Sequence, residues 1–113
     1  MNIVFRVQHD ELTDAAREYA ETRVATFLKF IPTLREAYIT YTKDMHHKSG
    51  DVAHVEVSLR VENDADATLI AEAEGASFQE TLDVVVGKLK HQVEGYKNKQ
   101  DSKDRSAQRA LEE

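Results

Sequence analysis

The sequence predicts an α+β two-layer sandwich, in which a four-stranded sheet carries two helices on one face. Four segments alternate apolar and polar side chains with the period of two that half-buried strands require, and two segments repeat apolar residues at helical spacing. The order of these segments along the chain is β-α-β-β-β-α. Because each strand has one apolar face and each helix one apolar stripe, both helices are expected to pack on the same side of the sheet.

The composition restricts the chain to one small domain. Its 113 residues, of which 41% are hydrophobic and 32% charged, suffice for a single hydrophobic core. Cysteine is absent from the sequence, which excludes disulfides, thiolate metal sites and a cysteine nucleophile. The sequence has neither an apolar run long enough for a membrane span nor the pattern of a signal peptide. We therefore expect a protein of the reducing cytoplasm without a membrane partner.

The first strand and the first helix are separated by a change of period. Residues 2–9 form the predicted strand, because apolar side chains alternate there with polar ones. Apolar residues then recur at helical spacing as far as Ile31, and Thr13 is the expected N-cap of this helix. Pro32 ends it, since proline lacks an N–H group and disfavours helical backbone in the preceding residue.

Three further strands follow. Residues 36–44 are rich in β-branched and aromatic side chains, which favour strands. Residues 52–62 alternate most clearly, so one face of the sheet is expected to be exposed to solvent. The glycine-containing link at 45–50 is typical of a hairpin loop, and the acidic turn at 62–66 leads to the fourth strand over 67–74.

The start of the second helix is the strongest local signal. Gly75 ends the fourth strand, and Ser77 with Glu80 forms a capping box, in which each side chain accepts from the other residue's backbone N–H. One continuous apolar stripe predicts a helix over about 78–99, so that residues 1–99 form the domain. The segment 100–113 has almost no apolar residues, and we expect a charged, disordered tail or a frayed extension of the helix.

The charge is unevenly distributed. The formal net charge of −6 argues against a general nucleic-acid binder, since such proteins usually carry a basic surplus. Residues 61–83 contain seven acidic residues and no Lys or Arg, whereas 84–99 contain four Lys against one Glu, a net of +3. A basic helix within an acidic protein still creates a local field that attracts an anion.

Two segments of the chain carry a family resemblance. They are DAAREYAETRVATFLKF after a short strand and AEAEGASFQETLDVVVGKLKHQVEGYKNK at the end of the domain. Their most specific features are the strand–glycine–capped-helix junction and the K-L-x-x-Q-x-x-x-Y-K-x-K ending from Lys88 to Lys99. Over about residues 1–99 the chain thereby resembles the ribosome hibernation promoting factor family, also described as ribosome-associated inhibitors or sigma-54 modulation proteins.

The resemblance implies a domain similar to double-stranded RNA-binding domains. Family members occupy the small ribosomal subunit where messenger and transfer RNA would bind, and so hold ribosomes idle in stationary phase or stress. Long members add a dimerisation domain; this chain resembles the short form and is expected to be a monomer off the ribosome. Family members contact ribosomal RNA through cations on both helices. The corresponding RNA-binding candidates are Arg17, Arg23, Lys29, Lys88, Lys97 and Lys99, together with the additional Lys90 and with His91, which stands where relatives commonly have Arg.

The same residues also permit interpretations without RNA. Lysines near the end of a helix stabilise its dipole and keep a protein soluble, and Arg17 can pair with Glu21 one turn later. A second functional hypothesis is a protein-interaction module, whose acidic strand face or polar sheet surface binds a partner such as a transcription factor. Salt dependence separates the two, because RNA contact predicts a steep linear fall of log affinity with log salt.

Catalysis, metals and cofactors are not expected. The serines lack a nucleophile elbow, and the four glycines are too far apart for a phosphate loop. His46, His47, His54 and Asp44 gather around the predicted hairpin, but adjacent histidines on an extended segment point to opposite sides. We interpret this group as a solvated loop. The prediction is a non-enzymatic protein without a small-molecule substrate.

Overall fold

The computed structural model describes residues 1–44, 50, 52–62 and 64–112, with side chains in these ranges except for 64–67 and 99–112. Its elements are β1 (Asn2–Gln8), α1 (Asp14–Ala25), the 3-10 helix η1 (Thr26–Lys29), β2 (Leu34–Asp44), β3 (Val52–Val61), β4 (Asp64–Gly75) and α2 (Phe78–Glu112). This order confirms the predicted α+β sandwich. Over the described residues, neither helix is long and apolar enough to cross a membrane.

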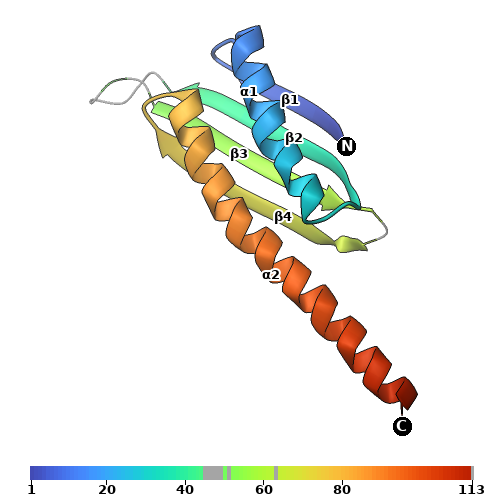
Figure 1. Cartoon of the computed structure of the whole chain (residues 1–113). Coiled ribbons are helices and arrows are strands. Elements are labelled where there is room, and N and C mark those ends of the chain that lie inside the picture. The colour runs from blue at the N-terminus through green and yellow to red at the C-terminus, as the bar shows by residue number, and fades with distance from the viewer. Residues whose placement is uncertain (45–49, 51, 63, 113) are drawn as a thin grey trace.

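The four strands form one sheet in the order β1-β2-β3-β4. β1 runs parallel to β2 and reaches it through α1, whereas β2, β3 and β4 pair antiparallel as successive hairpin strands. Both helices cover the same face of this sheet, as expected, and α2 continues past the sheet (Figure 1). The arrangement leaves β1 and β4 as the two edges of the sheet.

The hydrophobic core lies between the sheet and the helices. The register aligns Ile39, Val57 and Ala71 across the three antiparallel strands, and all three are buried. The α2 stripe covers this row with side chains that include Leu82 and Leu89, both fully buried. Burial of these alternate strand positions and of one helix stripe supplies the main driving force for folding.

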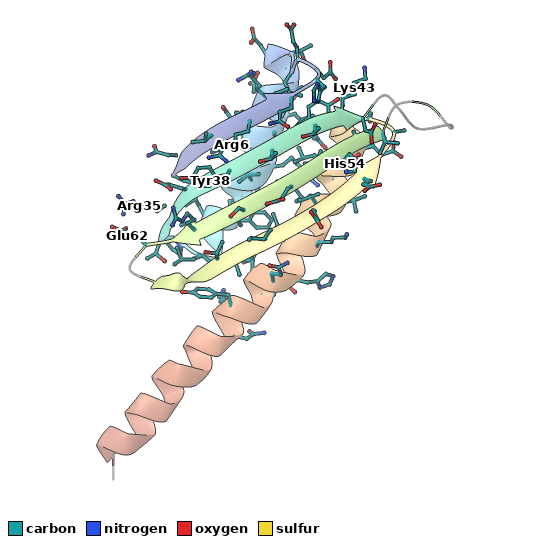
Figure 2. All side chains as sticks on the ribbon, turned by 180° about the vertical axis from the view of Figure 1, so that it is seen from behind. Arg6, Arg35, Tyr38, Lys43, His54 and Glu62 are labelled. Carbon is teal, nitrogen blue, oxygen red and sulfur yellow. The ribbon has the colours of Figure 1, made fainter. Side chains whose placement is uncertain are left out.

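The opposite face of the sheet is open, as the alternation in β3 predicts. Along β3 the side chains of His54, Glu56, Ser58 and Arg60 lie on this face and are exposed or half-buried, while their neighbours in sequence are buried. Figure 2 shows this uncovered face, with Arg6, Tyr38 and His54 on three different strands. The helices and the polar sheet surface therefore form two separate sides of the molecule.

Three boundaries differ from the sequence prediction. The first helix is α-helical only to Ala25 and ends in η1, where the Thr26 hydroxyl donates to the Arg23 carbonyl at 2.6 Å; a hydroxyl that bonds to nearby backbone competes with the helical ladder. β4 begins earlier than expected, since a register shift lets Asp64 pair with Val61. The backbone of α2 runs to Glu112. The disordered tail at 100–113 stays a prediction.

The junction between β4 and α2 is tightly packed at Gly75. Ser77 caps the helix by accepting from the Glu80 N–H at 3.3 Å, and the hydroxyl of Thr81 donates to the Ser77 carbonyl at 2.6 Å. The return bond of the predicted capping box, from the Ser77 N–H to the Glu80 side chain, does not occur among the described residues. A Cβ added at Gly75 would overlap with the Thr81 hydroxyl oxygen. Glycine is required here because Thr81 is buried and its hydroxyl is already bonded.

Replacing Gly75 with Ala is expected to lower the free energy of unfolding by about 1 to 3 kcal/mol, the usual range for overpacking. Gly87 is the matched control, because it lies in α2 with open space around its Cα. Gly87→Ala should raise stability by up to about 1 kcal/mol through helix propensity. Urea unfolding of both variants measures the difference, and equal midpoints would contradict the close packing at Gly75.

Candidate nucleic-acid interface

The cations of α2 lie on two flanks of its buried stripe. At about 100° per residue, Lys90 and Lys97 fall on the flank nearer α1, and Lys88 falls on the flank nearer β4. The contacts agree with this division. The Lys97 ammonium lies 5.8 Å from the centre of the Phe30 ring, beyond the end of η1, while the Lys88 ammonium donates to the Glu72 carbonyl of β4 at 2.9 Å.

A polar contact ties the two helices together through Asp83. The Tyr19 hydroxyl donates to Asp83 Oδ1 at 2.5 Å, and Arg23 Nε lies 3.6 Å from the same oxygen. The hydrogen bond to Asp83, and secondly desolvation, raise the pKa of Tyr19 above its ordinary value of 10.0. The hydroxyl therefore stays protonated, and its contribution is fully present below pH 10.0 and lost as the pH rises through the raised pKa.

The remaining predicted cations differ in how they are held. Arg17 lies over the Phe5 ring at 5.3 Å rather than against Glu21. Lys29, Lys90 and His91 are exposed, and the described part of the chain gives them no hydrogen bond or ion pair. The side chain of Lys99 lies outside the described residues. Lys29, Lys90, His91 and Lys97, which we call the cationic end, are thus available to an external anion or held only by a ring contact.

The cationic end is a limited part of the helical surface. α1 carries three acidic residues beside Arg17 and Arg23, and the first turns of α2 carry Glu80 and Asp83. From residue 88 to residue 97, by contrast, α2 has three Lys against Glu94 alone. The positive field of the helical side therefore concentrates around the second half of α2 and the adjacent Lys29.

Gln92 has a structural role that the sequence did not reveal. Its side-chain amide accepts from the Ile70 N–H at 3.1 Å and donates to the Ile70 carbonyl at 2.7 Å. With the Lys88 contact to Glu72, α2 thus satisfies backbone groups on the free edge of β4, as a neighbouring strand would. Unprotected edges invite pairing with another chain, so this contact favours a soluble monomer.

Gln92→Leu is expected to remove this edge protection with little loss of core packing. The Ile70 amide proton should exchange with solvent faster, and the protein should self-associate at high concentration. Hydrogen exchange by NMR and sedimentation velocity measure the two effects. Gln79→Leu, an exposed position on the other flank of α2, is the matched control. Unchanged Ile70 exchange in Gln92→Leu would contradict the assignment.

The histidines do not form a metal site within the described residues. His54 Nδ1 lies 3.2 Å from Glu74 Oε1 on the open sheet face. His46 and His47 lie outside the described residues, so the predicted loop around them stays a prediction. No group of three or more metal-ligating side chains occurs in the part of the chain that the structure describes.

The open sheet face contains two shallow grooves. One is lined by polar residues from three strands, including Thr40, His54, Glu56 and Glu72. The other lies beside the Arg6 guanidinium, which stacks over the Tyr38 ring at 5.6 Å, while the Tyr38 hydroxyl donates to Glu36 at 2.7 Å. The first groove is acidic, so the sheet side differs in charge from the cationic end.

The β-α-β-β-β-α order, with both helices on one face of the sheet, defines a class of small α+β domains with solved representatives. A ribosomal subunit interface protein from Coxiella burnetii shares the fold with a TM-score of 0.70 and 20% sequence identity, covering 87% of this chain and 99% of that one. The N-terminal domain of Protein Y from Thermus thermophilus matches with a TM-score of 0.68 and 23% identity, covering 85% and 99%.

The sequence settles the family. Residues 3–101 match the family described as sigma 54 modulation protein / S30EA ribosomal protein, and the chain belongs to this family. A comparison with curated proteins finds no match. The resemblance inferred from the strand–glycine–helix junction is thereby confirmed, and the chain is assigned to a family of ribosome-associated proteins.

Proposed function

We propose that this protein binds the ribosomal RNA of the small ribosomal subunit and inhibits translation by occupying the channel of messenger and transfer RNA. It acts as a cytoplasmic hibernation factor in stress or stationary phase. It is a non-enzymatic protein that needs no cofactor, and it is monomeric off the ribosome. Family membership supports association with the ribosome, and the protected edge of β4 supports the monomer.

The cationic end is the observation that carries this proposal. Lys29, Lys90 and His91 are exposed without partners among the described residues, in a protein whose overall charge is −6. An acidic protein that keeps free cations together on one side can meet a polyanion with that side while the remainder is repelled. The other candidates, Arg17, Arg23, Lys88 and Lys99, would extend the same contact along the two helices.

The proposed mechanism is competition for space. Phosphate contacts position a protein on RNA without reading its sequence, so recognition depends on the shape of the folded ribosomal RNA. A domain seated in the channel then excludes messenger and transfer RNA without any bond being made or broken. His91 adds a pH dependence, because phosphates favour its charged form and strengthen contact at mildly acidic pH.

Co-sedimentation with purified small subunits at several salt concentrations tests the proposal. Binding should weaken linearly in log affinity against log salt, with a slope of about −0.7 to −0.9 for each phosphate contacted. Binding that is insensitive to salt would contradict an RNA interface. Comparison with large subunits measures the specificity for the small one.

The acidic groove on the open sheet face supports a second candidate function, the binding of a basic protein segment. Glu56, Glu72 and Glu74 line this groove with His54, and no helix covers it (Figure 2). Under this alternative, charge reversal on the sheet would abolish partner binding and reversal at the cationic end would not. The same co-sedimentation assay with both sets of variants separates the two functions.

A further inference from the structure

Phe30 is exposed where an aromatic ring is usually buried. Four large apolar side chains are exposed among the described residues, and Phe30 is the aromatic one, with 40% of its surface accessible. It follows η1 directly, while its neighbours Phe27 and Ile31 are buried in the core. The backbone is therefore fixed on both sides of a ring that projects from the helical side of the molecule.

The surroundings of Phe30 belong to the cationic end. The Lys97 ammonium lies 5.8 Å from the ring centre, and Lys29 precedes Phe30 in the chain. Lys90 lies two helical turns before Lys97 on the same flank of α2, about 10 Å away along the axis. Glu94 is the acidic residue of this part of α2. An exposed ring thus lies among three lysines.

This combination matches the chemistry of unpaired RNA. Single-stranded nucleic acids are bound by aromatic rings that stack on bases, next to cations that contact the backbone. A base stack on a ring is stronger than an exposed cation–π contact, so a base can displace Lys97 from Phe30. The released ammonium then remains within reach of the phosphate attached to that base.

We propose that the Phe30 ring stacks on an unpaired base of the bound RNA, with Lys29 and Lys97 contacting the adjoining phosphates. This inference rests on the proposed RNA-binding function and adds one defined base contact to it. It predicts that the protein prefers a site where a base is unstacked over a continuous duplex of equal charge.

The chain contains no Trp, which permits a direct optical test. In Phe30→Trp the single indole should be quenched when an unpaired RNA oligonucleotide or the small subunit binds, and much less by an RNA duplex. Val84→Trp is the matched control, because Val84 is 49% exposed on α2 and lies outside the cationic end. Equal responses of the two variants, or quenching by the small subunit without quenching by unpaired RNA, would overturn the inference, the latter pointing to a ribosomal protein as the contact.

Affinity measurements separate this inference from the proposed function. Phe30→Leu should reduce affinity for the small subunit about tenfold at constant thermal stability, whereas Phe30→Tyr, which keeps a ring, should restore it. If wild type binds with a steep salt dependence and Phe30→Leu binds equally well, stacking is wrong and the RNA interface stands. If wild type itself shows no salt-dependent binding, both proposals fail.

Discussion

The double variant Lys90→Glu, Lys97→Glu is expected to bind the small ribosomal subunit on the order of a hundredfold more weakly than wild type. Each reversal replaces an attraction to phosphate with a repulsion, and a tenfold change corresponds to about 1.4 kcal/mol. The slope of log affinity against log salt should become shallower by about 0.7 to 0.9 for each lost contact. Co-sedimentation over a salt series measures both quantities.

The matched control reverses the same number of charges on the opposite side. Arg6 and Arg60 lie on the open sheet face, where Arg60 Nη1 is 3.7 Å from Glu36. Arg6→Glu with Arg60→Glu changes the net charge equally, so a comparable loss of binding would indicate a general charge effect instead of a local interface. Stability should change by only about 0.5 kcal/mol per site in the Lys90/Lys97 variant, because both residues are exposed.

Leu89→Ala is expected to destabilise the fold by about 2 to 5 kcal/mol, the usual cost of a buried Leu-to-Ala replacement. Leu89 is fully buried in the α2 stripe that covers the sheet. A domain of this size has a total stability of roughly 5 to 15 kcal/mol, so the variant should lose a large fraction of it. Thermal and urea unfolding measure the effect.

Val84→Ala is the control for this loss, since Val84 lies on the same helix and is 49% exposed. It removes apolar atoms from the solvent side and should change stability by about 0.5 kcal/mol at most. Similar unfolding midpoints for the two variants would show that α2 packs through a different stripe.

Local pattern was sufficient to predict the fold because every element carries its own signal. The alternation in β3 fixes which face is buried, Pro32 fixes the end of the first helical segment, and Ser77 marks the start of α2. The stripe of α2 then determines which flank carries Lys88 and which carries Lys97. These properties depend on residues that are close in the sequence.

The partners of the candidate residues depend on tertiary distances and were not predictable in the same way. Arg23 was expected to need a partner, but its partner Asp83 and the tie to Tyr19 join positions 64 residues apart. Lys88 flanks the stripe as expected, yet its contact with β4 follows from how α2 crosses the edge strand. Helical spacing predicts a direction, and only the packed structure identifies what lies there.

Competition with messenger and transfer RNA tests the central claim, that the helical side occupies their channel, most directly. In a purified translation assay, adding excess messenger and initiator transfer RNA should relieve inhibition by the wild-type protein, and no component should be chemically altered. The Lys90→Glu, Lys97→Glu variant should inhibit only at much higher concentration. Inhibition that persists unchanged in excess messenger and transfer RNA would contradict the account.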